Sequence, residues 1–339
     1  MVQTAFGLSR AQIRFLGRQA GLLGARVFAV GGCVRDRMLG FSTKDLDICV
    51  EGDAAPLARA FLEKWGGFSE SFDRFGTLRV FLKSGFRLDF ARTRLESYPS
   101  PAALPEVAPA ATIEEDLKRR DFSINAMAVE LTPEGLGRLL DPFGGYLDLR
   151  DKRLRVLHEK SFRDDPTRIY RAARFASRLS MRLESKTEAW LRDAAAKDYP
   201  ALLSRERVTQ ELLRILGEKR PAGALGLLER WKIIRFLWPN LKWRKADFRP
   251  KDTDVRIGVM VCLQGSKKGN LFLDSLRLRR PLAQAIRAAL ELMERKRSSP
   301  HPLDPLAVSI LRAAAPPGSP GPRSSAKGAA APRLPAPAL

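Results

Sequence analysis

The stretch VFAVGGCVRDRMLGFSTKDLDICVEG, residues 27–52, carries the pattern that decides the fold of this chain. Residues 26–30 form a run with β-branched and aromatic side chains, and Gly31 and Gly32 follow it. This pattern predicts a short strand and then a turn. Apolar and polar residues then alternate from Asp45 to Val50, which predicts a second strand with one buried face. The stretch therefore predicts a sheet in the N-terminal part of the chain.

The flanking sequence extends this sheet and adds helices to it. The spacing of apolar residues predicts helices over residues 8–24 and 54–65. Strand-like runs cover residues 78–82 and 87–91, and Ser84-Gly85 between them is typical of a hairpin turn. We expect roughly the first 135 residues to form a compact α/β or α+β unit of ordinary domain size.

The remaining sequence changes in character twice. From Thr93 to Thr112 there are four prolines and scattered apolar residues, which predicts a long loop of the kind that is usually functional or mobile. Helical patterns then run from about residue 164 to 313, so the second part is expected to be all α. From Ala315 onward there are seven prolines and no acidic residue, which is typical of disorder. The predicted division is a first domain over 1–140, a helical segment over 141–215, a second helical segment over 216–314 and a disordered basic tail over 315–339.

The charge balance indicates the kind of partner. The chain of 339 residues has 60 Lys and Arg against 38 Asp and Glu, a formal net charge of +22. Such an excess predicts attraction to a polyanion through phosphate contacts, although a basic surface without a partner remains the alternative. Three widely separated cysteines and two histidines argue against a disulfide framework, a zinc site and a Ser/His/Asp triad. No apolar run is long enough for a membrane span and no signal peptide is evident, so the expected location is the cytoplasm.

The glycine turn and the two aspartates predict a site for a nucleotide and a metal. Backbone N–H groups at Gly31 and Gly32 can approach phosphate oxygens closely because glycine has no Cβ. Asp45 and Asp47 are two residues apart in a strand, so both carboxylates project from one face, where they can share divalent cations such as Mg²⁺. The alternative is a solvated strand face. If the two aspartates do bind cations, Arg35 would neutralise a triphosphate beside them. Nucleotidyl transfer requires this arrangement.

A third carboxylate from a neighbouring strand often joins such a site. Asp89 is the candidate here, within FRLDFARTR. The alternative for Asp89 is a structural role, either capping a turn or pairing with Arg92 or Arg94.

These motifs resemble a known family. GGCVRD followed by DLD resembles the signature of the DNA polymerase β nucleotidyltransferase superfamily, and within it the class II tRNA nucleotidyltransferases (CCA-adding enzymes) and bacterial poly(A) polymerases. EDLKRRDFSINAMAV, residues 115–129, resembles the family's RRDFTxNA motif, with Ser123 in place of Thr. DPFGG at 141–145 and DDPTRIYRAARFASRL at 164–179 are also similar to family motifs, the second with Asp164 in place of Glu. The resemblance covers about residues 25–215.

The resemblance implies an α+β fold, with a polymerase-β-like nucleotidyltransferase head that has a small mixed sheet, followed by all-α neck and body domains. It implies that Asp45 and Asp47 hold Mg²⁺ and act in catalysis, and Asp89 remains the candidate for a third catalytic carboxylate from the strand pattern. It implies that the sugar and triphosphate site is lined by Arg119, Arg120, Asp121 and Asn125. Further candidates for nucleotide binding lie in the glycine-turn motif: Gly31, Gly32, Arg35 and Asp36. From the residues alone, Arg119-Arg120 could be an ordinary charged surface pair, and Asn125 could cap or turn the chain.

Asp165 and Arg168 are three residues apart, about one turn of a helix. The simple interpretation is a surface ion pair. The resemblance implies a sharper one, because a carboxylate can accept from the amino group of cytosine or adenine while a guanidinium donates to the ring nitrogen. Guanine and uracil present the reverse pattern and are rejected. Arg171 and Arg174 lie on the polar side of the same helix and are candidates for phosphate contact.

The implied function is template-independent addition of C and A (CCA, or A alone) to the 3′ end of tRNA from CTP and ATP, with release of pyrophosphate. The later helical region is rich in cations and poor in aromatics, which favours a folded RNA such as the acceptor arm of tRNA. The loop over 93–112 is not shortened, and in the family a short loop accompanies CC-only addition. The alternatives are a poly(A) polymerase and a non-catalytic RNA-binding protein that retains the fold. The sequence carries no prediction of oligomeric state.

Overall fold

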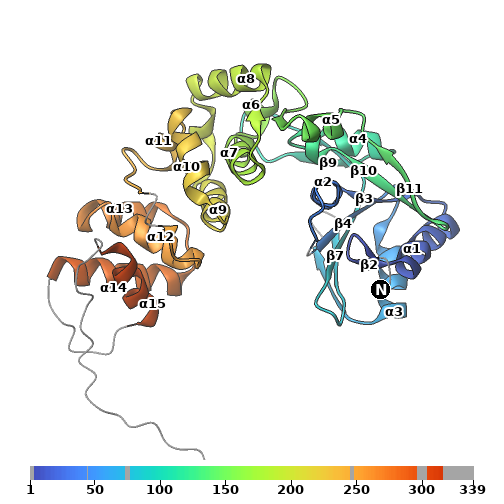
Figure 1. The fold of residues 1–339 in the computed structure, drawn as a ribbon, viewed down its shortest axis with the longest axis horizontal. Helices are drawn as coiled ribbons and strands as arrows, with labels where there is room; N and C mark the ends of the chain where they lie inside the picture. The colour runs from blue at the N-terminus through green and yellow to red at the C-terminus, as the bar shows by residue number, and fades with distance from the viewer. Residues whose placement is uncertain (1–3, 44, 73–76, 245–247, 296–303, 316–339) are drawn as a thin grey trace, which may run out of the picture. The chain divides into compact units, whose positions relative to one another are not determined.

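The computed structural model describes residues 4–43, 45–72, 77–244, 248–295 and 304–315. It divides the chain into two compact units, Met1–Leu203 and Ser204–Leu339, both drawn in Figure 1. Apart from Ala315, the predicted tail lies outside the described residues. The four-part division of the chain stays a prediction, whereas the α+β class with a mixed sheet followed by helices is confirmed.

A mixed sheet of seven strands organises the first unit, in the order β11-β10-β3-β4-β7-β6-β5. Its central pair, β4 and β7, is parallel, and the other neighbouring strands are antiparallel. The strands are β3 (Val27–Val30), β4 (Asp45–Val50), β5 (Phe68–Phe72), β6 (Thr77–Phe81), β7 (Arg87–Arg92), β10 (Ala128–Thr132) and β11 (Gly135–Leu140).

The sheet is covered on both faces. Helices α1 (Arg10–Leu22) and α3 (Ala54–Trp65) pack on one face, and Figure 1 shows them together on that side of the sheet. On the other face, Phe28, Val30 and Cys49 pack against residues of α4 (Ile113–Lys118). Since side chains alternate along a strand, Asp45 and Asp47 lie on the same face as Cys49, opposite the main core. The aspartates are thus held by a rigid, buried strand while their carboxylates stay outside the apolar layer.

The remaining elements of the first unit are short strands and helices. They are β1 (Thr4–Ala5), β2 (Leu8–Ser9), α2 (Gly32–Met38), β8 (Arg94–Ser97), β9 (Glu106–Pro109), η2 (Ser123–Asn125), α5 (Gly145–Arg150), β12 (Arg153–Leu154), α6 (Ser161–Asp164), α7 (Thr167–Leu179), β13 (Arg182–Leu183), α8 (Ser185–Ala196) and η3 (Tyr199–Leu202). The pair β12 and β13 is a small departure from the all-α expectation for this part of the chain.

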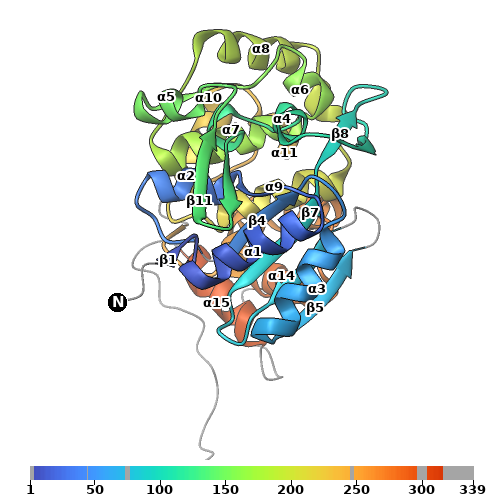
Figure 2. The same cartoon turned by 90° about the vertical axis from the view of Figure 1, so that its right-hand side faces the viewer.

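The prediction of a long loop over residues 93–112 is wrong. Strands β8 and β9 pair antiparallel, with Arg94 opposite Pro109 at one end and Ser97 opposite Glu106 at the other. The Thr93 hydroxyl donates to the Ala110 carbonyl at 2.9 Å and closes the base of this hairpin. Near the tip, the Ala102 amide donates to the Arg163 carbonyl at 3.1 Å, and Figure 2 shows β8 beside α4 and α6. Prolines at strand ends and on a two-stranded edge do not disrupt such pairing, so the proline count was a poor guide.

Helices build the described part of the second unit. They are α9 (Arg205–Leu216), α10 (Pro221–Arg230), α11 (Ile234–Leu237), α12 (Thr253–Cys262), α13 (Ser266–Ser275), α14 (Arg280–Arg295) and α15 (Pro305–Ala314). Arg205 donates to the carbonyls of Phe236, Leu237 and Ser275, so it ties three segments of the unit together. None of the helices in the described ranges is long and apolar enough to cross a membrane.

Two glycines on α1 provide a matched stability test. A Cβ at Gly17 would lie 2.2 Å from the backbone carbon of Thr132 in β10, whereas a Cβ at Gly21 meets nothing within 4 Å. We expect Gly17→Ala to lower the free energy of unfolding by about 2 kcal/mol through overpacking. Gly21→Ala should leave it unchanged or raise it by up to about 1 kcal/mol through helix propensity. Urea denaturation of both variants measures the difference, and equal effects would contradict the close packing of α1 on the sheet.

Candidate active site

The glycine turn after β3 approaches an arginine from another part of the chain. Gly31 has φ +74°, and its amide donates to the Met127 carbonyl at 3.0 Å. A Cβ at Gly31 would lie 2.5 Å from Nη1 of Arg120, so a side chain here would both strain the backbone and displace that guanidinium. Gly32 is the first residue of α2, the helix that also carries Arg35 and Asp36. The turn thus packs the Arg120 guanidinium against Gly31, which is buried. Because the Gly31 N–H is used by Met127, it is not available to a phosphate, and the predicted phosphate contact of Gly31 is wrong for this N–H group.

The structure brings the three candidate carboxylates to neighbouring positions. Asp45 and Asp47 share one face of β4, and Asp89 on β7 is the register partner of Asp47. Arg79 on β6 donates to Asp89 with Nε at 2.8 Å and Nη2 at 3.2 Å. Arg87 on β7 forms an ion pair with Asp45. The alternative interpretation of Asp89 was that it pairs with an arginine, either Arg92 or Arg94. Asp89 does pair with an arginine, but that arginine is Arg79.

The electrostatics of Asp47 differ from those of an ordinary surface carboxylate. Desolvation by the surrounding protein raises the pKa of Asp47. Arg120 opposes this rise, whereas Asp89 and Asp45 add to it. Three carboxylates this close repel one another, and a cation among them would relieve that repulsion.

The donor set fits a hard divalent cation. Within the described ranges, no group of three or more His, Cys, Asp and Glu side chains is arranged to hold a metal ion. Asp45 and Asp47 nevertheless offer oxygen ligands from one face of one strand, and a cation such as Mg²⁺ is commonly bound through one or two carboxylates, with water and substrate phosphates completing its shell. The residues present therefore fit a cation that binds together with a nucleotide.

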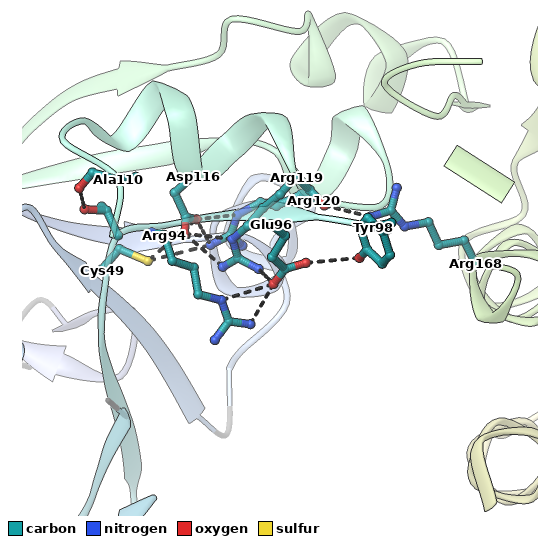
Figure 3. A network of polar contacts seen from close by, with 10 residues as sticks. Cys49, Arg94, Glu96, Tyr98, Ala110, Asp116, Arg119, Arg120 and Arg168 are labelled. Atoms are coloured by element: carbon teal, nitrogen blue, oxygen red, sulfur yellow. Dashed lines mark hydrogen bonds and ion pairs between the residues drawn. The ribbon is translucent and has the colours of Figure 1, made fainter. Parts of the chain in front are cut away.

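Arg119 and Arg120 are held by one buried carboxylate (Figure 3). Asp116 on α4 is fully buried, and its two oxygens accept from Arg119 Nε at 2.9 Å and from Arg120 Nη2 at 2.9 Å. Although desolvation acts in the opposite direction, the two guanidinium groups lower the pKa of Asp116, so the carboxylate stays ionised. Arg120 also donates to the Cys49 thiol sulfur at 3.7 Å, on the strand that carries the aspartates. The two arginines are built into the fold and are not an ordinary surface pair.

The hairpin β8–β9 takes part in the same network. Glu96 on β8 accepts from Arg119 Nη1 at 2.7 Å, from Arg94 Nη2 at 2.9 Å and from the Tyr98 hydroxyl at 3.1 Å. Figure 3 shows these side chains meeting between the hairpin and α4. Burial raises the pKa of Tyr98 to about 12, so its hydroxyl stays a donor. The segment predicted as a loop thus helps to fix a predicted nucleotide-binding residue.

Arg35, Asn125 and Asp121 form a second chain of contacts, which ends on α7. Arg35 is buried and donates to the Asn125 side-chain oxygen at 2.5 Å and to Asp36 at 2.7 Å. The Asn125 amide donates to Asp121 at 2.9 Å, and Arg171 donates to the other Asp121 oxygen at 2.8 Å. Asn125 therefore connects Arg35 to Asp121 through its side chain. This is more than the capping or turning role that its sequence position suggests. The role of Arg35 at a triphosphate stays a prediction, since its guanidinium is buried against these neighbours.

The Asp121 carboxylate provides a pH test of this chain. Desolvation raises its pKa, but Arg171 and the Asn125 amide more than compensate and lower the pKa of Asp121 to about 2. A carboxylate whose folded pKa lies below its ordinary value stabilises the protein above about pH 4, and that contribution is lost as the pH falls toward 2. We expect wild type to exceed Asp121→Asn by about 2 kcal/mol in unfolding free energy at pH 6. Denaturation measured from pH 6 to 2.5 should show this difference in unfolding free energy becoming smaller. A difference that stays constant would contradict the lowered pKa of Asp121.

Asp165 and Arg168 lie at the start of α7 without pairing through the guanidinium of Arg168. Arg168 is buried, and it donates to the Ser161 hydroxyl and to the Arg119 carbonyl, each at 2.7 Å. One oxygen of Asp165 accepts from the Thr167 amide at 3.0 Å and from its hydroxyl at 2.6 Å. The two contacts of Arg168 use part of the five N–H donors of a guanidinium, which leaves donors for a base. The surface ion pair that the spacing allowed is not what the structure shows.

Phe175 is a residue of the site that the motif reasoning passed over. Its ring is buried on α7, with the guanidinium carbons of Arg174, Arg35 and Arg171 at 4.6, 5.1 and 5.7 Å from the ring centre. An aromatic face attracts cations, so this ring gathers arginines from α2 and α7. Asp116 and Glu96 were missed as well. Asp116 could have been found as an acidic residue one helical turn before Arg119-Arg120. Glu96 could have been found as a polar residue in the strand-like alternation over 94–97.

Comparison with known proteins identifies the family. The family model described as Poly A polymerase head domain matches residues 27–155. A solved structure of a CCA-adding enzyme in an apo form superimposes with a TM-score of 0.71 at 35% identity, covering 84% of this chain and 73% of that one. The chain belongs to the class II CCA-adding enzyme family. The head-domain match spans the glycine turn, the aspartates and the Arg119–Asn125 segment of this family member.

Other members of the family differ in what their names specify. A Thermotoga maritima CCA-adding enzyme complexed with tRNA superimposes with a TM-score of 0.68 at 30% identity, covering 90% of this chain and 78% of that one. An A-adding tRNA nucleotidyltransferase of Geobacter sulfurreducens is 41% identical over 231 residues, which are 68% of this chain and 26% of that protein. The chain therefore spans about a quarter of the length of that relative. Members named CC-adding and multifunctional CCA proteins also match.

Proposed function

We propose that the protein is a template-independent nucleotidyltransferase that adds C and A, as CCA or as A alone, to the 3′ end of tRNA from CTP and ATP. The observation that carries this proposal is the direct bond between the candidate base-selecting residue and the nucleotide-binding segment. Arg168 donates to the Arg119 carbonyl, and Arg171 on the same helix donates to Asp121. A helix that reads a base is thereby anchored to the segment that would hold the sugar and triphosphate of the same nucleotide.

The transfer itself would take place at β4. A divalent cation such as Mg²⁺, held by Asp45 and Asp47, would activate the attacking hydroxyl and stabilise the leaving pyrophosphate. The 3′-hydroxyl of the RNA attacks the α-phosphate in line, the bond to the bridging oxygen breaks, and pyrophosphate leaves. Arg120 lies beside the glycine turn and near Asp47, and we propose that its positive charge holds the phosphate chain against this strand.

Selection of the base would take place at α7. Arg168 is fixed on two sides, so its remaining donors have a defined direction. Asp165 is fixed by Thr167 in the same way. An acceptor beside a donor matches cytosine and adenine, whereas guanine and uracil would leave both groups unpaired. Because protein side chains supply the pattern, no nucleic-acid template is needed.

The names of the relatives support tRNA and nucleoside triphosphates as the substrates, and they indicate which specificities have to be distinguished. Proteins named A-adding tRNA nucleotidyltransferases are 41%, 42% and 40% identical to this chain over the aligned residues. The solved relatives include structures described with CTP, with an ATP analogue and with primer tRNA. Addition of A alone and of complete CCA are therefore the two outcomes to separate first. A cytoplasmic location accords with a tRNA substrate and is part of the proposal.

The test uses the purified protein, Mg²⁺ and defined RNA ends. Three tRNA transcripts that lack CCA, end in CC or carry complete CCA are incubated with CTP, ATP or both, beside an unrelated RNA oligomer, and the products are sequenced. A-adding activity extends only the CC end by one A, whereas a CCA-adding activity completes both short ends. Extension of the unrelated oligomer by many A residues would establish a poly(A) polymerase instead. No incorporation on any RNA would overturn the proposal in favour of a binding protein.

A further inference from the structure

Arg87 places a positive charge among the carboxylates of the candidate metal site. Asp45 and Arg87 are register partners across the parallel strands β4 and β7, as are Asp47 and Asp89. The guanidinium of Arg87 forms an ion pair with Asp45 through Nη2, and its Nε lies 3.6 Å from Asp89 Oδ2. One side chain therefore bridges two of the three carboxylates.

The contacts of Arg87 are those of an exchangeable group. Its side chain is 36% exposed and that of Asp45 is 51% exposed, and ion pairs this accessible to water are weak. Its Nε is buried but makes no hydrogen bond within the part of the chain that the structure describes. These contacts leave the pairing of the guanidinium with Asp45 open to exchange with ions from solvent.

Arg79, the neighbouring arginine, behaves differently. It holds Asp89 through two hydrogen bonds, at 2.8 and 3.2 Å, and the bond to Asp89 raises the pKa of the Arg79 guanidinium. These two hydrogen bonds go to one carboxylate, so Arg79 is a bidentate partner of Asp89. Arg87, by contrast, is divided between Asp89 and Asp45, a predicted metal ligand on β4.

We propose that Arg87 competes with the divalent cation for Asp45 and so sets the metal affinity of the site. The inference rests on the proposed function, because it assumes the cation at Asp45 and Asp47. A cation that binds Asp45 must displace a guanidinium from the same oxygen or accept its repulsion, and either lowers the affinity. A bound triphosphate supplies negative charge that attracts both the cation and the displaced arginine. Arg87 thereby makes metal binding weak without nucleotide and stronger with it.

The experiment measures binding of Mn²⁺ by the full-length protein without any turnover. Free Mn²⁺ is followed by electron paramagnetic resonance during titration of wild type, Arg87→Gln, Arg87→Lys and Arg92→Gln. Arg92 is an exposed arginine at the other end of β7, so Arg92→Gln removes the same charge away from Asp45. We expect Arg87→Gln to lower the apparent Kd for Mn²⁺ about tenfold. Arg87→Lys and Arg92→Gln should each stay within about twofold of wild type.

Two further arms separate this proposal from the proposed function. Adding a non-hydrolysable CTP or ATP analogue should tighten Mn²⁺ binding more in wild type than in Arg87→Gln. Equal Mn²⁺ affinity of wild type and Arg87→Gln, with binding abolished by Asp47→Asn, would overturn the role of Arg87 and leave the metal site in place. Absence of Mn²⁺ binding in every variant, even with the analogue, would overturn the metal site itself. Thermal unfolding without metal checks that each variant is folded.

Discussion

Replacing Asp47 by alanine is expected to abolish nucleotide incorporation while leaving the fold and the affinity for RNA intact. Stabilisation of a phosphoryl-transfer transition state by a metal is worth several kcal/mol, and each 1.36 kcal/mol corresponds to a factor of ten in rate. We therefore expect a loss of about a thousandfold or more in the rate of single-nucleotide addition. Asp45→Ala should act in the same direction. The measurement is extension of a tRNA transcript under single-turnover conditions, beside a filter-binding assay for the same RNA.

The environment of Asp47 makes the control unusually clear. A carboxylate whose folded pKa is raised is disfavoured as an anion in the native state, but Asp47 is exposed, so solvent screening keeps its effect on stability at neutral pH small. Asp47→Ala should therefore unfold at nearly the same temperature as wild type. Glu63→Gln, which changes an exposed carboxylate on α3 of the same unit, should preserve activity. Unchanged incorporation by Asp47→Ala would remove the metal assignment, and a large drop in Tm would remove the electrostatic interpretation.

The second large effect is expected at Arg168. Arg168→Ala should lose discrimination between the correct nucleotides and GTP or UTP by about tenfold or more, since each mismatched buried polar group costs about 1–3 kcal/mol. Steady-state kcat/KM for each of the four nucleotides measures the ratio directly. The affinity for RNA should fall much less than this ratio. Full retention of discrimination would defeat the selection model.

Arg168 is also a structural contact, so a second variant is needed. Asp165→Asn keeps the side-chain oxygen that can accept from Thr167 and replaces the other oxygen by a donor. This variant should admit GTP or UTP with little change in stability, because a base that offers a carbonyl would then find a partner. Lys160→Gln, an exposed change just before α6, is the matched control and should leave the selectivity unchanged.

The local sequence predicts the elements whose pattern is complete within a few residues. The strand over Asp45–Val50 and the helix over Ala54–Trp65 begin and end where the alternation and the apolar spacing place them. Strands β5, β10 and β11 were missed, because their pattern becomes legible only once the partner strands are known. The local sequence of the hairpin β8–β9 likewise predicts a loop, although its prolines stand at positions that strand pairing permits.

For the candidate site, sequence reasoning supplied residue types and left their partners open. It placed Asp89 near the aspartates but named the wrong arginines, because register across β6 and β7 depends on the turn between them. It assigned Arg119, Arg120 and Asn125 to one nucleotide site without naming the residues that hold them. Their common supports, Asp116 and Glu96, carry no motif of their own and emerge only from burial and distance. A close charge partner from another strand or helix is a three-dimensional property that spacing in one chain does not encode.

The bond from Arg168 reaches the main chain of residue 119 and not its side chain. Any amino acid at that position offers the same carbonyl, so substitutions of Arg119 can alter the handling of phosphate or the grip of Glu96 without loosening Arg168. If Arg119 binds phosphate and Arg168 selects the base, as proposed, the two properties are separable by mutation, and phosphate affinity can change in evolution while the choice of base is preserved. Only an insertion, a deletion or a proline that moves this peptide unit would change both at once.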